Sequence, residues 1–290
     1  MFKGSMVALV TPFKDGVFDE KAYGDLIQWH IAEGISAIVP CGTTGESATL
    51  EYDEHYRVIE VAVEAAAKRI SVIAGTGANA TDETIKMTKK AKSLGVDGVL
   101  LVCPYYNKPT QEGLFRHYRA IAEAVDIPQV LYNVPGRTAL NMLPTTVARL
   151  SAFENIVAIK EASGDMRQVS EVIRLCGDRM TILSGDDFTT FALMMLGGKG
   201  VISVTANLMP KAVAQMCSLV ESGQIDKARE AHYGLDILNG IMFVETNPIP
   251  VKTALALMGK INEEFRLPLC EMSYDNKEKL KTVLTAYKLI

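Results

Sequence analysis

The chain has 290 residues, of which 48 % are hydrophobic and 22 % are charged, and its formal net charge at pH 7 is −4. This composition is typical of a globular protein that buries a sizeable core, and the length suits one large domain or two ordinary ones. The sequence has neither a basic block nor basic residues interleaved with aromatic ones, which argues against a nucleic-acid-binding protein. No apolar run is long enough to span a membrane.

The N-terminus, MFKGSMVALVTPFKDG, contains only a short apolar stretch, too short for a secretory signal peptide. The 5 cysteines are scattered and never spaced C-x-x-C. They are expected to be small core residues in a reducing compartment, with no disulfide and no zinc site. We therefore expect a cytoplasmic protein. The cysteines are Cys41, Cys103, Cys176, Cys217 and Cys270.

Eight short runs rich in apolar and β-branched residues predict β-strands. They lie at residues 6–10, 36–40, 71–75, 98–103, 129–133, 156–160, 180–184 and 200–204. Most runs are apolar at both alternating positions, so both faces of each strand should be buried, as in a parallel sheet. Eight parallel strands close a (β/α)₈ barrel, the TIM-barrel fold of the α/β class. A doubly wound open sheet is the alternative, but it usually has fewer strands and an edge to protect.

Helical patterns lie between the strands, for example at 52–69 and 81–95. In the second, Thr81 is expected to cap the N-terminus and Gly95 to end the helix. Beyond residue 222 only helical patterns follow, interrupted by Pro248 and Pro250. We therefore predict a barrel over residues 1–222 and a C-terminal helical extension over 223–290, packed on the barrel without a flexible linker.

Polar residues follow several of these strands, where the chemistry of such barrels is placed. Lys160 ends the run IVAIK, and a lysine at a strand end commonly extends to water. The alternative is an amine that forms a Schiff base, which requires a desolvated site because an ordinary lysine is almost entirely protonated at neutral pH. Both parities of the strand are apolar, so the direction of the Lys160 side chain stays open.

The turn CGTTGES, which contains Thr43 and Thr44, could bind a carboxylate or phosphate through backbone N–H groups, or could be an ordinary turn before a helix. Tyr132 and Arg137 follow the fifth strand. A buried tyrosine is more often a core residue than an acid or base, and an arginine is more often solvated. In a barrel mouth, however, Arg137 would suit capture of a carboxylate.

Other patterns give weaker evidence for a functional site. Tyr105 and Tyr106 after the fourth strand are more often packing residues than catalytic ones. GTGANA lacks the third glycine of a dinucleotide-binding turn. Asp53, Glu54 and His55 are adjacent in sequence, but this spacing does not suit a metal site, and the start of a solvated helix is the simpler interpretation.

Taken together, the motifs resemble those of the dihydrodipicolinate synthase family. They are GTTGES, PYYNKP, YNVPGR, IKEASG, SGDD, GVISV and NPIPVK, in the family's order and across essentially the whole chain. GTTGE and IKE are shared with a wider superfamily of pyruvate Schiff-base aldolases that includes N-acetylneuraminate lyase, whereas YNVPGR is more specific. The resemblance implies a barrel with C-terminal helices that condenses pyruvate with L-aspartate 4-semialdehyde in lysine and diaminopimelate biosynthesis, without metal or cofactor.

The resemblance also implies roles for individual residues. Lys160 would form the imine, and Thr44, Tyr132 and Tyr106 would relay protons, with Tyr106 reaching in from a neighbouring subunit of a homotetramer. Thr43 and Thr44 would hold the pyruvate carboxylate, and Arg137 the second substrate. Gly185 and Ile202 would line the pyruvate pocket. Gly136 stands where a serine is frequent, which should loosen the turn more than alter the chemistry.

A second, inhibitory site for L-lysine at the dimer interface is implied as well. Its matching residues are Ser47, Ala48, Tyr52, His55, Asn79, Glu83 and Tyr105. Tyr52 stands where lysine-sensitive members commonly have a histidine. Two alternatives to the synthase are a pyruvate lyase acting on a sugar acid, which would need Arg137 less, and a non-catalytic barrel that senses an amino acid. Retention of Lys160, Tyr132 and Thr44 argues against the second.

Overall fold

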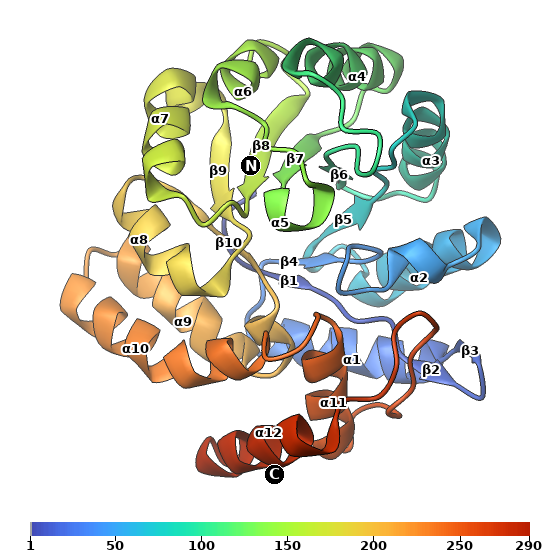
Figure 1. Ribbon diagram of the computed structural model, residues 1–290, viewed down its shortest axis with the longest axis vertical. Helices are drawn as coiled ribbons and strands as arrows, with labels where there is room; N and C mark the ends of the chain where they lie inside the picture. Colours follow the sequence, from blue (N-terminus) through green and yellow to red (C-terminus); the bar gives the residue numbers. More distant parts are fainter. Residues whose placement is uncertain (1) are drawn as a thin grey trace.

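Eight parallel strands form a closed barrel at the centre of the molecule (Figure 1). The computed structural model describes residues 2–290. The strands are β1 Gly4–Ala8, β4 Ala37–Val39, β5 Ser71–Gly75, β6 Gly98–Val102, β7 Gln129–Asn133, β8 Ile156–Glu161, β9 Thr181–Ser184 and β10 Gly200–Ser203. The barrel closes because β1 pairs with both β10 and β4. All eight predicted strands are present, and the prediction of a (β/α)₈ barrel is confirmed.

Helices surround the barrel and connect its strands (Figure 1). They are α1 Glu20–Ala32, α2 Tyr52–Ala66, α3 Thr81–Ser93, α4 Gln111–Ala124, α6 Pro144–Leu150, α7 Met166–Cys176, α8 Thr190–Met195 and α9 Pro210–Glu221, with the short α5 Pro135–Thr138 after β7. The predicted cap of α3 is wrong. Thr81 is already helical, Ala80 occupies the cap position, and the Thr81 hydroxyl lies 2.9 Å from His117 Nδ1 instead. Gly95, with a φ of 89°, follows the helix as expected.

A two-stranded antiparallel hairpin, β2 Phe13–Lys14 and β3 Val17–Phe18, follows the first barrel strand and was not predicted. Its turn residues Asp15 and Gly16 both have positive φ, 54° and 80°. An Asp-Gly pair is a strong hairpin signal because both positions of this turn require a left-handed backbone. The strands on either side are only two residues long, too short to show an alternating pattern.

Side chains of β8 alternate between the inside and the outside of the barrel. Ala158 belongs to the apolar cluster inside the barrel, whereas Ile159 belongs to the cluster between strands and helices. Lys160 therefore points inward, and Glu161 points outward, where its carboxylate accepts hydrogen bonds from Asn133 and Gln168 side chains. This alternation resolves the direction of Lys160, which the sequence left open.

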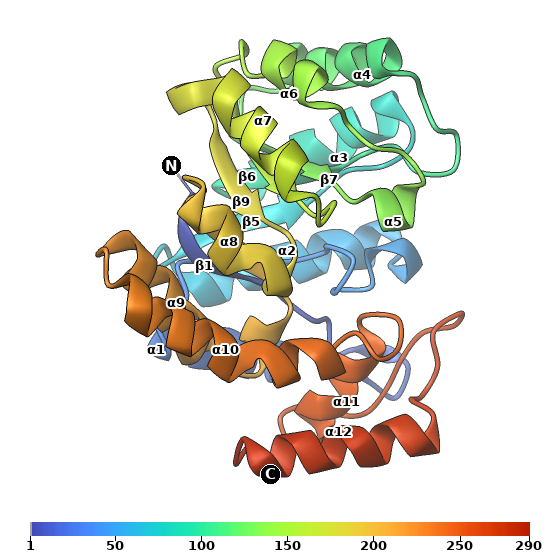
Figure 2. The ribbon, with the colours of Figure 1, turned by 60° about the vertical axis from the view of Figure 1, so that its left-hand side comes forward.

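The chain continues after the barrel into α10 Ile225–Ile241, α11 Ile249–Leu257 and α12 Tyr274–Ala286, and Pro250 lies in the first turn of α11. Figures 1 and 2 show α11 and α12 together at the end of the molecule beside α1, with α12 outermost. Side chains of α11 and α12 share one buried cluster with Val10 and Leu26. Within residues 2–290 no helix has the length and apolar character needed to cross a membrane.

Candidate active site

Lys160 is a buried amine, only 5 % exposed, at the end of β8. It is the register partner of Tyr132 on β7, and its Nζ lies 4.3 Å from the centre of the Tyr132 ring. Burial lowers the pKa of Lys160 to about 8, while the nearby charge of Asp187 opposes this shift and that of Arg137 adds to it. A lowered pKa gives a lysine the neutral, nucleophilic form near physiological pH.

Gly185, directly after β9, leaves the space that the Lys160 side chain occupies. A Cβ at this position would lie 2.9 Å from both Cγ and Cε of Lys160 and 2.7 Å from the Ala162 Cβ. Any larger residue would therefore displace the lysine stem. Gly185 acts here by close approach, since its φ is not in the left-handed region.

The buried carboxylate of Asp187 lies behind this part of the barrel. It accepts hydrogen bonds from the backbone N–H groups of Val204, at 2.9 Å, and Thr205, at 3.1 Å. Burial raises the pKa of Asp187, and these hydrogen bonds oppose the rise. In the sequence, SGDD is only one of the motifs that carry the family resemblance. Asp187 was not expected to act on the charge of Lys160, because that effect depends on a contact between β8 and the segment after β9.

Thr43 and Thr44 lie on the turn between β4 and the short 3-10 helix Ser47–Thr49. Thr44 is 2 % exposed, and its hydroxyl accepts a hydrogen bond of 3.0 Å from the Asn247 side chain. Asn247 is also buried, and its Oδ1 has no hydrogen-bond partner among the described residues. Asn247 begins the motif NPIPVK, but no local pattern indicates its contact with Thr44, because the two residues lie 203 positions apart in the chain.

Tyr132 is buried at the end of β7, with a side chain that reaches into the same space. Burial raises its pKa, and the charge of Arg137 and a side-chain hydrogen bond with Thr43 oppose the rise. Its phenol is therefore protonated at neutral pH and can donate a proton or a hydrogen bond.

Arg137 on α5 lies at the outer rim of the site, and its guanidinium donates a hydrogen bond of 3.1 Å to the backbone oxygen of Asn247. Arg137 also lines a cavity at this end of the barrel. A planar guanidinium in this position can bind a carboxylate through two parallel hydrogen bonds.

A cavity of about 170 Å³ brings most of these groups together at the carboxyl ends of the strands. The predicted residues that line it are Thr43, Thr44, Tyr132, Arg137, Lys160 and Gly185. Ile202 does not line it, because this side chain lies in the core inside the barrel, and Val204 lines the cavity in its place. Tyr106 also lies outside it and is 90 % exposed.

A second cavity, of about 480 Å³, adjoins the first. Thr43, Val134, Arg137 and Asn247 line both cavities and so form the wall between them. Six of the seven residues implied for a lysine site line the second cavity: Ser47, Ala48, Tyr52, His55, Glu83 and Tyr105. The seventh, Asn79, does not line it, and its backbone oxygen accepts a hydrogen bond from the Asn107 side chain.

Two expectations about single residues are wrong. His55 is not in a solvated helix start, because it lies on the buried face of α2 and its Nε2 is 2.9 Å from the Gly75 backbone oxygen. Cys270 is exposed, whereas the other four cysteines are buried as expected. No set of three or more His, Cys, Asp or Glu side chains within residues 2–290 could hold a metal ion.

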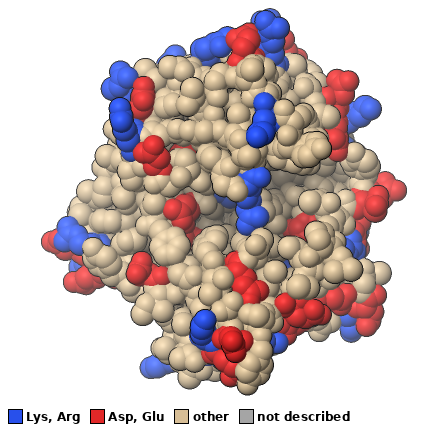
Figure 3. Space-filling model, viewed as in Figure 1, with Lys and Arg blue, Asp and Glu red and all other residues tan. Residues whose placement is uncertain are grey.

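The face seen in Figure 3 carries both signs of charge and shows no extended basic area. Basic side chains stand singly or in small groups, both around its edge and near its centre, and many at the edge lie beside acidic ones (Figure 3). The formal net charge of −4 agrees with this distribution. This face therefore lacks the broad positive patch of a nucleic-acid-binding surface.

Comparison with known proteins places these features in a family. The model of the dihydrodipicolinate synthetase family matches residues 1–287. The 4-hydroxy-tetrahydrodipicolinate synthase of Thermodesulfovibrio yellowstonii is 66 % identical over 290 residues, which cover all of both chains.

Solved structures of dihydrodipicolinate synthases have the same fold. The enzyme from Acinetobacter baumannii, solved in complex with pyruvate, is 48 % identical with a TM-score of 0.98, and the match covers 100 % of each chain. The enzyme from Cyanidioschyzon merolae, solved with lysine bound, is 41 % identical with a TM-score of 0.97, over 100 % of this chain and 99 % of that one. The chain therefore belongs to the dihydrodipicolinate synthetase family.

Proposed function

We propose that the chain is a lyase that condenses pyruvate with L-aspartate 4-semialdehyde through a Schiff base on Lys160, in lysine and diaminopimelate biosynthesis. The observation that carries this proposal is the buried Lys160 amine, whose pKa is lowered to about 8 in a cavity lined with hydroxyl groups and a guanidinium. Family membership supports the same activity. We place the enzyme in the cytoplasm, in keeping with its scattered, unpaired cysteines.

The first half of the reaction makes a nucleophile from pyruvate. The neutral Lys160 amine attacks the ketone carbon, and loss of water gives a protonated imine. Thr43 and Thr44 hold the pyruvate carboxylate, while the Tyr132 phenol supplies the proton that the departing water requires. The imine then withdraws electrons from the methyl group, which loses a proton and becomes an enamine.

The second half uses the enamine. Its carbon attacks the aldehyde of L-aspartate 4-semialdehyde, whose carboxylate Arg137 binds. The amino group of that substrate next displaces Lys160, which releases a cyclic product and restores the free amine. Two assays of the purified protein test the proposal: consumption of pyruvate in the presence of the semialdehyde, and release of pyruvate from N-acetylneuraminate. Activity with the sugar acid alone would favour the lyase alternative.

Replacing Arg137 with alanine should lower kcat/KM for the semialdehyde by roughly 10–100-fold, the loss expected for a charge-assisted hydrogen-bonding pair. Trapping of the pyruvate imine with borohydride should change far less. Arg137→Lys keeps the charge without the planar pair of donors, so its kcat/KM for the semialdehyde should fall between those of the unmodified enzyme and Arg137→Ala. Equal losses in both steps would contradict the assigned role of Arg137.

The rate of imine formation at saturating pyruvate should rise with pH and level off above pH 8. Only the neutral amine attacks, and with a pKa of about 8 roughly one lysine in ten is neutral at pH 7, against about one in three thousand for an ordinary lysine. Borohydride trapping rates measured from pH 6 to 10 give the midpoint. A rate that continues to climb through pH 10 would show that Lys160 has an ordinary pKa in the working enzyme.

The same proposal includes assembly into a homotetramer built from dimers, in which Tyr106 enters the neighbouring active site. Tyr106 is 90 % exposed with a left-handed φ of 70°, and its neighbour Tyr105 is 41 % exposed. Two adjacent phenol rings that project from the protein are unusual on a free surface and suit an interface.

We also propose that L-lysine binds in the larger cavity and inhibits the enzyme. The Glu83 carboxylate accepts a hydrogen bond of 2.7 Å from the Tyr52 hydroxyl and is available to an ammonium group. The Tyr52 phenol thus donates a hydrogen bond to Glu83, which a histidine at this position could also do. The shared wall with the catalytic cavity, which includes Thr43 and Arg137, provides a physical route by which a ligand on one side affects the other.

Glu83→Gln should raise the L-lysine concentration for half-maximal inhibition about tenfold or more, because the variant loses a charge-assisted contact with an ammonium group. Calorimetry and initial rates with millimolar L-lysine provide the measurement. Asp82→Asn is the matched control, since Asp82 is exposed and adjacent on α3. If L-lysine neither binds nor slows the unmodified enzyme, the inhibitory site is refuted.

A further inference from the structure

The turn that carries Thr43 and Thr44 is attached to the C-terminal extension by a buried ion pair. Glu46 follows Thr44 by two residues, and its carboxylate pairs with Lys252 of α11. Both side chains are 0 % exposed. The backbone at Glu46 is left-handed, with a φ of 53°, a conformation that residues other than glycine seldom adopt. A side chain fully buried against a partner can hold such a backbone in place.

Lys252 and Glu46 lie in a dense set of contacts. Lys252 Nζ lies 4.3 Å from the centre of the Phe13 ring and 5.1 Å from that of Phe265. Burial lowers the pKa of Lys252, while the charge and hydrogen bond of Glu46 oppose this shift. The second carboxylate oxygen of Glu46 accepts the backbone N–H of Arg266 at 3.2 Å. Glu46 is therefore held by two separate parts of the C-terminal extension.

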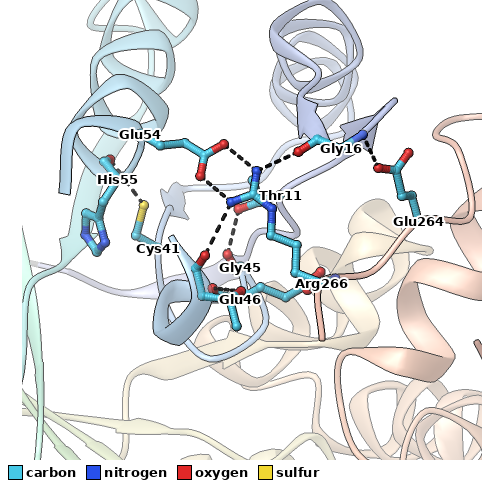
Figure 4. Close-up of polar contacts among 10 residues, drawn as sticks. Thr11, Gly16, Cys41, Gly45, Glu46, Glu54, His55, Glu264 and Arg266 are labelled. Carbon is cyan, nitrogen blue, oxygen red and sulfur yellow. Dashed lines mark hydrogen bonds and ion pairs between the residues drawn. The ribbon is translucent and has the colours of Figure 1, made fainter. Parts of the chain in front are cut away.

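Arg266 extends this connection to the start of the chain (Figure 4). Its guanidinium pairs with Glu54 of α2 and donates hydrogen bonds to the backbone oxygens of Gly16, at 3.0 Å, and Thr49, at 3.3 Å. Figure 4 shows Glu54, Glu46 and Gly16 arranged around this single side chain. The loop after α11 is thus fixed against both the hairpin turn and the start of α2.

The turn itself is packed tightly on its barrel side. The Thr11 hydroxyl donates a hydrogen bond of 2.7 Å to the Gly45 oxygen (Figure 4). A Cβ at Gly45 would lie 3.1 Å from the backbone oxygen of Leu9 and from the backbone nitrogen of Cys41. The far end of the turn depends on Glu46, whose N–H bonds to the Thr43 oxygen at 3.1 Å. A shift of Glu46 would therefore move Thr43 and Thr44.

We propose that Glu46 and Lys252 are positioning residues that fix the turn Gly42–Glu46 for binding of the pyruvate carboxylate, so that the C-terminal extension supports catalysis as well as the fold. Neither residue lines the catalytic cavity, so both act through Thr43 and Thr44. The inference rests on the carboxylate-binding role given to these threonines in the proposed function. Asn247, five residues before Lys252, touches the same turn through the Thr44 hydroxyl.

Glu46→Gln tests the inference, because glutamine keeps the shape and removes the carboxylate charge. Lys252 then lacks its ionic partner, but burial already lowers the pKa of this amine, so it can lose its proton. We expect the KM for pyruvate to rise about tenfold and borohydride trapping at low pyruvate to slow in proportion, with a smaller change in kcat. Lys252→Met leaves a buried carboxylate unpaired and can prevent folding. The double variant Glu46→Gln/Lys252→Met has no unpaired buried charge, and the same rise in KM is expected for it.

Lys277→Met is the control. It breaks the pair between Lys277 of α12 and Glu263, which belongs to the same extension and is partly buried but does not touch the turn. We expect a lower unfolding temperature and an unchanged KM for pyruvate. If Glu46 had a purely structural role, Glu46→Gln would likewise lower the unfolding temperature and leave the KM for pyruvate unchanged.

Two outcomes overturn the inference. One is a folded Glu46→Gln variant and a folded double variant with the KM of the unmodified enzyme. The other is failure of both to fold, which would show that the pair serves the fold alone. Thr44→Val distinguishes failure of the positioning role from failure of the proposed function. If Thr44→Val also leaves the KM for pyruvate unchanged, the carboxylate-binding role given to the turn is wrong. If Thr44→Val raises the KM and the Glu46 variants do not, only the positioning role is refuted.

Discussion

Replacing Lys160 with alanine should lower turnover by about 10⁴-fold or more, the order of loss when an enzyme's nucleophile is removed. The unmodified enzyme incubated with pyruvate and borohydride should gain the mass of one reduced imine per chain, located on the peptide that contains Lys160. The variant should gain none. Intact-protein mass spectrometry followed by peptide mapping measures both results.

Lys260 provides a matched control for this experiment. Its pKa is also lowered by burial, but its Nζ lies 3.7 Å from the centre of the Trp29 ring, away from the cavity. Lys260→Ala should keep full adduct formation, because a lowered pKa without a pocket for pyruvate does not suffice. An adduct that survives Lys160→Ala, or the absence of any adduct in the unmodified enzyme, would refute the imine mechanism.

The barrel could be predicted from the sequence because its strands are buried on both faces. Runs such as residues 156–160 are apolar at both parities, which identifies a parallel strand but hides which residues face inward. The inward direction of Lys160 therefore emerged only from the clusters to which Ala158 and Ile159 belong. An apolar run can thus predict a buried strand without predicting which of its side chains face the inside of the barrel.

Contacts between segments far apart in the chain could not be predicted from the sequence either. Asn247 meets Thr44 across 203 residues, and Lys252 meets Glu46 across 206. No local pattern indicates such pairs, although both partners lie in motifs that carried the family resemblance. His55 shows a different error: adjacency to Asp53 and Glu54 suggested a solvated start, whereas helical spacing places His55 with Val58 and Ile59 on the buried face of α2.

Tyr132→Phe should lower kcat by roughly 10²–10³-fold, the usual contribution of a positioned acid or base. The ring that packs against Lys160 remains, so folding and the lysine's surroundings should change little. Steady-state kinetics with both substrates and the rate of borohydride trapping measure the loss. Tyr118→Phe is the control, because Tyr118 is also buried but its hydroxyl donates to the Leu101 backbone oxygen, outside the site.

Tyr106→Phe should show a loss of similar order for a different reason, since this side chain is 90 % exposed on its own chain and would act in a neighbour's site. The two variants can then be mixed after reversible dissociation. In a dimer of one Tyr132→Phe chain and one Tyr106→Phe chain, one site lacks both phenols and the other has both. Random mixing makes half of the dimers hybrid, so about a quarter of the sites should be complete and activity should return to roughly that level.

The recovery depends on which chain supplies the phenol, and this makes the mixture decisive. If Tyr106 acted in the site of its own chain, every site in the hybrid would lack one phenol and activity would stay at the level of the single variants. If Tyr106 had only a packing role, Tyr106→Phe alone would retain most of its activity before any mixing. Sedimentation of the mixture confirms that the chains have reassociated, so that low activity reflects the sites and not separated subunits.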